Sequence, residues 1–237
     1  MKAHDRSTPA VAWLLGALLL TPALVSGDPR PREWNPTIDP ANFTDIVDNP
    51  YFPLPVGRVT SYRGEMKDGI ETLEIRVTSR SRTIMGVRTV EMVERHALDG
   101  VLVEVSRNWF AQDRDGNVWY FGEFSQSYEN GVPSGTEGSW EAGVGDALPG
   151  IIMKADPQTG DTYFQEFAPG IAEDQAQVKS TTESITVPQG TYGAVVVTRE
   201  WTSLESNSIE KKYYGPGVGL IMEENGPELL QLVKIEN

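Results

Sequence analysis

The sequence predicts an all-β protein, an antiparallel meander of roughly ten strands that forms a strongly curved sheet, a half-barrel or a barrel with long loops. Three observations support this prediction. Apolar and polar residues alternate along most of the chain after Arg58, turns rich in glycine, asparagine and aspartate recur at short intervals, and almost no segment has the period of a helix. Such a meander must curl or close to bury its apolar face.

Residues 1–27 have the features of a secretory signal peptide. A short charged lead precedes an apolar run from Ala10 to Val25, and small residues follow it. We therefore expect cleavage near Gly27 and export of a soluble chain to the periplasm or the extracellular space. The alternative is a retained membrane anchor, because the run approaches the lower length limit of a spanning helix.

The rest of the chain is strongly acidic. Removal of Lys2, Arg6 and Asp5 with the signal leaves 18 basic residues against 33 acidic ones, from totals of 20 and 34. This charge repels nucleic acid and anionic membranes, so no nucleic-acid partner is expected. The sequence contains no cysteine, which excludes disulfides, thiolate metal sites and a lipid-modified cysteine.

Residues 28–57 form an extended lead-in that contains seven prolines and no apolar periodicity. No regular structure is expected before Val59. Within the lead-in, residues 49–54 place two aromatic residues and a leucine among prolines, a composition suited to a clip lying against a sheet. Residues 58–237 form a single β domain, because no internal linker or repeat divides them.

The first hairpin of the domain is predicted around Asp68-Gly69, where a two-residue turn would pair Tyr62 with Ile75 and leave one face of the sheet largely apolar. Three further strands are predicted at residues 87–98, 101–113 and 117–128. The turns that join them are Asp99-Gly100 and Asp115-Gly116.

The register of these three strands predicts a ligand site. If both turns contain two residues, Glu91, Asn108 and Glu123 align across one face, with large rings beside them. Carboxylates, an amide and rings on a concave face have the composition of a binding site. The glycine-rich loop after Asn130 is expected to cover this face as a lid. The predicted ligand-binding residues are Glu91, Asn108, Phe110, Trp119, Phe121, Glu123, Trp140 and Glu141.

The second half of the chain continues the meander. Residues 151–153 form a short apolar piece, and residues 162–167 follow Gly160-Asp161. Turn residues then separate five predicted strands, at residues 177–187, 193–204, 209–214, 218–223 and 229–235.

The acidic turn from Asp113 to Asn117 makes calcium the one candidate cofactor. An EF-hand loop requires glycine at position 6 and glutamate at position 12, whereas here the glycine arrives at position 4 and position 12 is Phe124. Aspartate before glycine is what a tight hairpin requires for its own geometry. We therefore expect no cofactor, with a calcium ion as the alternative.

No catalytic residue can be assigned from the sequence. Beyond the signal there is one histidine, His96, and no G-x-S-x-G motif, so a serine–histidine mechanism is disfavoured and His96 is expected to be a satisfied or edge residue. Carboxylate pairs could act as acid and base, although such pairs also arise by chance in an acidic chain. The candidate pairs are Glu91 with Glu123, Glu137 with Glu141, and Glu173 with Asp174.

Two motifs, D-G-N-V-W-Y-F-G-E at residues 115–123 and E-G-S-W-E-A-G at residues 137–143, resemble an uncharacterised family of exported bacterial all-β proteins. The resemblance covers most of the chain from Asn49 onward. A third motif, Y-G-P-G-V-G-L at residues 214–220, is similar to turns in the half-open barrels of periplasmic lipoprotein carriers. The resemblance implies an apolar groove under a curved sheet and supplies no catalytic residue.

Three functions remain open at this point. The first is an exported binding protein for a small apolar, amphiphilic or lipid-like ligand on the concave face. The second is a hydrolase that uses a carboxylate pair, with or without a divalent cation, and the third is a structural component of the cell envelope. A binding protein predicts a continuous apolar cavity, an enzyme a cleft with converging carboxylates, and an envelope component an exposed flat apolar patch.

Overall fold

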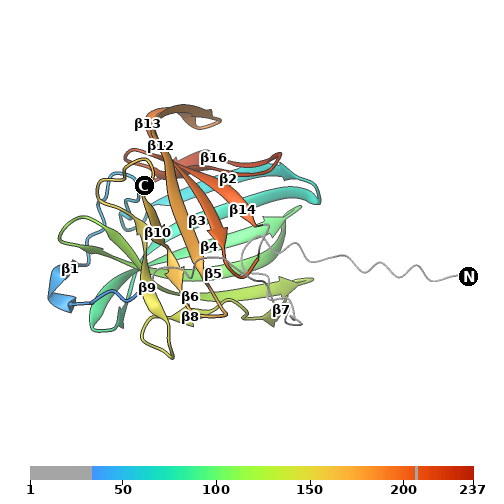
Figure 1. Ribbon diagram of the computed structural model, residues 1–237. Coiled ribbons are helices and arrows are strands. Elements are labelled where there is room, and N and C mark those ends of the chain that lie inside the picture. The colour runs from blue at the N-terminus through green and yellow to red at the C-terminus, as the bar shows by residue number, and fades with distance from the viewer. Residues whose placement is uncertain (1–33, 206–207) are drawn as a thin grey trace, which may run out of the picture.

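The computed structural model describes residues 34–205 and 208–237, so the predicted signal peptide lies outside the described residues. The described chain is all-β and forms one antiparallel sheet that is nearly closed into a barrel. The predicted fold class is therefore confirmed (Figure 1). No helix among the described residues has the length and apolarity to cross a bilayer.

The sheet contains sixteen strands within the described residues, several of them very short. Their bounds are β1 Phe43–Thr44, β2 Val59–Met66, β3 Gly69–Ile84, β4 Val87–Leu98, β5 Val101–Asp113, β6 Val118–Glu129, β7 Val132–Gly135, β8 Trp140–Glu141, β9 Leu148–Met153, β10 Thr162–Phe164, β11 Glu166–Phe167, β12 Asp174–Val187, β13 Gly190–Thr202, β14 Ile209–Gly215, β15 Gly219–Asn225 and β16 Glu228–Glu236.

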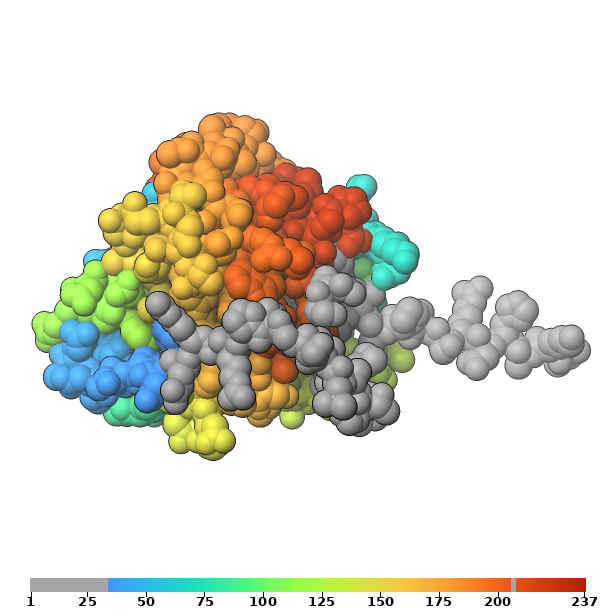
Figure 2. Space-filling model, viewed as in Figure 1, coloured from blue at the N-terminus to red at the C-terminus, as the bar shows by residue number. Residues whose placement is uncertain are grey.

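The strand order explains how the sheet closes. Neighbours run β10-β12-β13-β14-β15-β16-β2-β3-β4-β5-β6-β9-β11, so the C-terminal strand β16 pairs with β2. The two ends of this path meet because β10 and β11 follow each other in the chain, and β9 contacts both. Figure 2 shows the outside of this region, where the yellow segment around β9 and β10 lies beside the orange strands β12 and β13.

The lead-in contains more regular structure than its prolines predict. A 3-10 turn, η1 (Pro40–Asn42), follows Asp39, whose carboxylate accepts a hydrogen bond from the Ala41 amide. Strand β1 then pairs with β5. The prediction failed here because the Asp39 cap and an extended partner strand supply backbone hydrogen bonds that no apolar periodicity signals.

The first hairpin is shifted from the predicted register by two residues. Its turn lies at Lys67-Asp68, so Tyr62 pairs with Leu73 and not with Ile75. A shift of two leaves every side chain on its predicted face, because side chains alternate with a period of two. The buried residues Tyr62, Leu73 and Ile75 therefore point into the barrel as expected.

The second hairpin has the predicted turn and a different register beyond it. Leu98 pairs with Val101, and both Asp99 and Gly100 have positive φ angles, as a two-residue turn requires. A β-bulge at Val103 then shifts the register by one, so Met92 faces Asn108. The predicted alignment of Glu91 with Asn108 is wrong, because a one-residue shift moves a side chain to the other face.

The third hairpin contains a second bulge. Asn108 pairs with Glu123, as predicted, but Phe121 is an extra residue and Phe110 pairs with Tyr120. The bulge leaves Glu123 and Tyr120 facing into the barrel. It turns Phe121, like Trp119, to the outside, where both rings pack against Phe43 of the lead-in. The prediction that Trp119, Phe121 and Glu123 share one face is therefore wrong.

Candidate ligand-binding site

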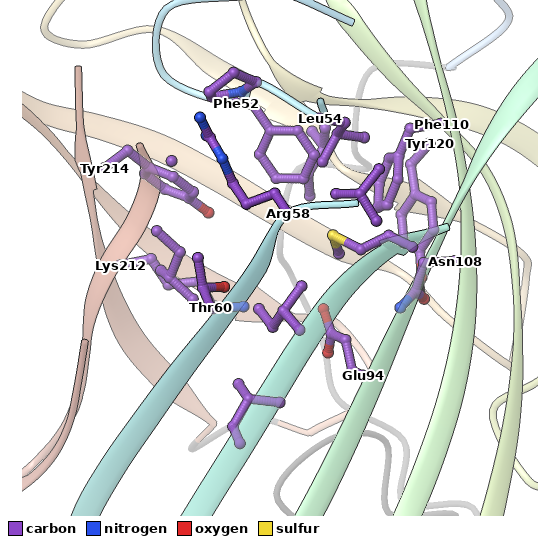
Figure 3. Close-up of a pocket in the computed structure, with 18 of the residues that line it drawn as sticks. Phe52, Leu54, Arg58, Thr60, Glu94, Asn108, Phe110, Tyr120, Lys212 and Tyr214 are labelled. Atoms are coloured by element: carbon purple, nitrogen blue, oxygen red, sulfur yellow. Dashed lines mark hydrogen bonds between the residues drawn. The ribbon is translucent and has the colours of Figure 1, made fainter. Parts of the chain in front are cut away.

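The barrel contains a partly open cavity of about 130 Å³. Its wall combines side chains from strands on opposite sides of the barrel with residues of the lead-in. Figure 3 shows Phe52 and Leu54 at one end of the cavity, with Glu94, Thr60 and Lys212 further from them. The cavity therefore has a mainly apolar end, beside which Arg58 also lines the wall, and an end rich in ionisable groups.

Residues 49–54 of the lead-in close the apolar end, and we call this segment the plug. The ring of Phe52 meets that of Phe110 edge to face at 5.1 Å between centroids, and Phe110 stacks on Tyr120 at 4.6 Å. Aromatic pairs at such separations add to the stabilisation from burial alone. The expectation that this segment lies against the sheet is confirmed, since Leu54 is buried and Phe52 packs against the core.

Asn49 anchors the plug. Its backbone amide donates to Gln112 Oε1 at 2.8 Å, and its side-chain Nδ2 donates to the carbonyl oxygens of Gly116 at 2.9 Å and Lys154 at 3.1 Å. Its Oδ1 accepts from the Tyr51 amide at 2.8 Å. Every polar atom of this buried side chain is thus satisfied, which fixes the plug on the turn regions of the barrel.

The ionisable end carries more carboxyl groups than cations. Four glutamates and two basic side chains line the cavity at this end. The glutamates come from β4, β6, β11 and β15, and the basic residues from β4 and β14. They are Glu94, Glu123, Glu166, Glu223, His96 and Lys212.

Lys212 is held by three carboxylates. Its Nζ lies 3.3 Å from Glu200, 3.0 Å from Glu210 and 3.8 Å from Glu223. Burial alone would lower the pKa of Lys212, but the charges of Glu210, Glu200 and Glu223 outweigh burial and raise that pKa well above its ordinary value. Lys212 is therefore charged and already fully engaged.

His96 is the centre of a second charged group. Its Nδ1 lies 3.0 Å from Glu71 Oε1, and its Nε2 lies 3.7 Å from Glu94 Oε2. Burial would lower the pKa of His96, but the carboxylates of Glu71 and Glu94 raise it to about 10. His96 is thus a buried cation beside two carboxylates, but its Nε2 has no hydrogen-bond partner, so the expectation of a satisfied histidine holds for Nδ1 only.

Glu123 and Glu166 lack such a partner. Burial, with the charges of Glu104 and Glu94, raises the pKa of Glu123 to about 8. Burial and Asp174 raise the pKa of Glu166 well above its ordinary value, while burial raises that of Asp174 to about 6. Glu123 and Glu166 therefore hold protons near neutral pH, chiefly because burial removes them from water.

Three of the residues predicted to bind ligand line the cavity, namely Asn108, Phe110 and Glu123. Each polar atom of the Asn108 side chain has one partner, since Oδ1 accepts from the Tyr120 hydroxyl and Nδ2 donates to Ser106 Oγ at 3.0 Å. Asn108 therefore shapes the wall, and these bonds use only one of the two N–H donors of Nδ2.

The other five predicted residues lie away from the cavity surface. Glu91 accepts a hydrogen bond from Thr78 Oγ1 at 3.0 Å, and Glu141 forms an ion pair with Arg82. Trp140 belongs to β8 and packs edge to face on Tyr120 at 5.3 Å. It therefore supports the cavity wall from behind and is no lid, while Trp119 and Phe121 lie under the lead-in.

Sequence reasoning missed the residues that strands distant in the sequence bring to this site. Lys212 and Tyr214 alternate along β14, and Glu223 lies on β15. This alternation of lining residues was visible in the sequence, but which face points inward depends on closure of the barrel. Glu166 was missed because β11 is only two residues long.

The acidic turn that suggested calcium is occupied by internal hydrogen bonds. Asp113 accepts from the Asn117 amide at 2.8 Å, from Asn117 Nδ2 at 2.9 Å and from Trp119 Nε1 at 2.8 Å. This geometry supports the structural interpretation of the turn. Within residues 34–205 and 208–237, no group of three or more acidic or histidine side chains has the arrangement of a metal site.

Comparison with known proteins leaves the fold and the cavity as the basis for function. No family model, no curated protein and no solved structure matches the chain. The resemblance to exported bacterial proteins therefore stays an expectation from the quoted motifs.

Proposed function

We propose that this chain is an exported binding protein that holds a small, mainly apolar ligand with one polar group inside its barrel. The observation that carries the proposal is the cavity of about 130 Å³, which has an apolar end under the plug and an ionisable end opposite. Binding pockets are concave and mostly apolar, with a few placed polar groups that orient the ligand.

The volume of the cavity limits the size of the ligand. A cavity of about 150 Å³ lined by apolar side chains accommodates benzene, so one of about 130 Å³ suits a single ring or a short branched chain. A longer molecule would extend out of this space, because the cavity is partly open. The buried part of the proposed ligand is therefore smaller than the lipid-like molecules that the sequence suggested.

Filling the cavity tests the proposal. Leu220 on β15 is half-buried and lines the cavity, so Leu220→Trp places a large ring in the space a ligand would occupy. Leu229→Trp on the exposed side of β16 is the matched control. Isothermal titration with benzyl alcohol, a neutral eight-atom probe, should show binding to the parent and the control, and at least tenfold weaker binding to Leu220→Trp.

Absence of benzyl alcohol binding to the parent chain, or equal binding to Leu220→Trp and the parent, would contradict the proposal. Circular dichroism shows whether each variant is folded before titration. Native mass spectrometry of protein purified from its own host provides an independent measurement, because a tightly held natural ligand of this size would be retained.

A carboxylate-based hydrolase is a second candidate, and one observation favours it. Glu123 and Glu223 both line the cavity, and burial raises the pKa of Glu123 to about 8 and that of Glu223 to about 7, so near neutral pH the two carboxyls differ in protonation. Unequal carboxyls are the basis of acid–base catalysis. Release of product from small ester or glycoside substrates by the parent, abolished in Glu123→Gln, would favour the enzyme over the binding protein.

A further inference from the structure

We propose that the polar group of the ligand is a protonated amine, which binds between Glu123 and Glu166 at the ionisable end of the cavity. This inference rests on the proposed function and names the class of its ligand. It is carried by two observations on the described residues: the distribution of charge on the cavity wall and an unsatisfied carboxyl oxygen.

Three basic side chains line the cavity: Lys212 and His96 are held by carboxylates, and Arg58 donates to Asn237 Oδ1 and to the Gly217 carbonyl. Lys212 lies within 4 Å of Glu200, Glu210 and Glu223, and His96 lies between Glu71 and Glu94. Neither cation forms an ion pair with Glu123 or Glu166 in the part of the chain that the structure describes. The wall therefore has two carboxyl groups that still lack a positive partner.

Glu166 also has an unused hydrogen-bonding atom. The residue is 7% exposed and lines the cavity, and its Oε2 has no hydrogen-bond partner. Its neighbour Asp174 is also a carboxyl. The two groups can share one proton, but when both are ionised neither can donate a hydrogen bond to the other. A buried acceptor without a donor is costly, and an ammonium group supplies both a donor and the missing charge.

The surroundings of the two carboxyls disfavour other head groups. The charged groups that act on these two carboxyls or share the cavity wall with them are Glu94 and His96 on β4, Glu104 on β5, Asp174 on β12, Lys212 on β14, Glu223 on β15 and, near the plug, Arg58. Most of these groups are acidic, so a carboxylate or phosphate head would be repelled. A hydroxyl head could donate a hydrogen bond but, having no charge, would not favour ionisation of either carboxyl.

Binding of an amine in this site releases a proton. The pKa of Glu123 is raised to about 8, so near neutral pH its carboxyl is mostly protonated. An ammonium ion beside it favours the carboxylate, and the carboxyl proton passes to the solvent while the ligand keeps its own charge. No bond to carbon or nitrogen changes, and binding should strengthen as pH rises towards 8.

Three probes of one size and different charge test the inference by isothermal titration at pH 7 and pH 8. Benzylamine is cationic, benzyl alcohol is neutral and benzoate is anionic. We expect benzylamine to bind at least about tenfold more tightly than benzyl alcohol, as one charge-assisted hydrogen bond provides, and benzoate not to bind. Titrations in two buffers of different ionisation enthalpy should show net proton release with benzylamine and none with benzyl alcohol.

Variants assign the effect to the two carboxyls. Glu166→Gln and Glu123→Gln keep the size and the neutral form of each side chain, so both should fold and retain benzyl alcohol binding. Each should lose most of the preference for benzylamine. Glu129→Gln, at the exposed end of β6, is the matched control and should behave as the parent.

The possible failures are distinguishable. If benzyl alcohol binds as tightly as benzylamine, or if the amine preference persists in both variants, the amine inference is overturned while the binding function stands. If none of the three probes binds the folded parent, the proposed function itself fails and the inference falls with it.

Discussion

The two ends of the cavity solve different physical problems. At the plug end, Asn49 has a partner for each polar side-chain atom, and aromatic rings fill the space around Phe52. At the opposite end, Glu123 holds a proton because no cation pairs with it, and Glu166 keeps an oxygen without a hydrogen-bond partner. One end is internally complete, and the other is not.

This difference separates what stabilises the barrel from what the barrel can bind. A satisfied polar network stabilises the fold and has no capacity left for a ligand. Buried groups that lack partners reduce stability, and natural proteins retain such groups mainly at functional sites. The contrast predicts that mutations at the plug end will only lower stability, whereas removing charge at the other end can raise it.

Lys212 is the exception at the ionisable end, and its loss should have the largest effect. Lys212→Met leaves Glu200 and Glu223 without their cation, and breaking a buried ion pair in this way costs about 3–5 kcal/mol of unfolding free energy. Urea denaturation at pH 8 should measure this loss. At pH 5 the loss should be smaller, because the abandoned carboxyls can take up protons.

Lys211→Met is the matched control, since Lys211 is the preceding residue on β14 and pairs with Glu224 on the exposed side. A surface ion pair of this kind contributes at most about 1 kcal/mol. An equal loss in both variants would mean that the three carboxylates around Lys212 do not depend on it.

The plug should be the next most sensitive element. Asn49→Ala removes three hydrogen bonds and leaves the Gly116 and Lys154 carbonyls and the Tyr51 amide without a partner. We expect a loss of about 3 kcal/mol, measured by urea denaturation. Asn42→Ala in the exposed part of the lead-in is the control and should change stability by less than about 0.5 kcal/mol. A loss no larger than that of the control would show that the plug is not anchored through Asn49.

The fold could be predicted from the sequence because alternation and turn residues act locally. Asp99-Gly100 forms the predicted turn, and the shift of the first hairpin by two residues left Tyr62 and Leu73 on their predicted face. Neither observation depends on how the sheet closes. The antiparallel barrel follows from many such local signals, which tolerate small errors in register.

The site could be predicted only in part because two bulges decide which side chains point inward. Asn108 and Glu123 pair as expected, but single extra residues at Val103 and Phe121 place Glu91 and Trp119 away from the cavity. Gly122, a glycine inside β6 with a positive φ, follows Phe121 and is the one sequence sign of the second bulge, whereas Val103 has no such sign. Lys212 and Glu166 reach the site through closure of the barrel, which no local pattern specifies.

The dependence of unfolding free energy on pH also tests the difference between the two ends of the cavity. The raised pKa values of Glu123, Glu223 and Asp174, about 8, 7 and 6, mean that the folded chain binds more protons than the unfolded chain above pH 4.5 or so. The contribution of these three carboxyls to the unfolding free energy is therefore complete below that pH and is lost as pH rises to about 8. His96 has a pKa raised to about 10. Its contribution to the unfolding free energy also falls as pH rises, beginning above about 6.5.

Glu123→Gln isolates one of these contributions. Glutamine resembles the protonated carboxyl, so the variant should match the parent near pH 4.5 and exceed it at pH 8, with a shallower decline of unfolding free energy between the two. Glu129→Gln, exposed on the same strand, should follow the parent at every pH. A variant as pH-dependent as the parent would show that Glu123 ionises freely in the barrel, and the ionisable end would then need no cationic ligand to balance it.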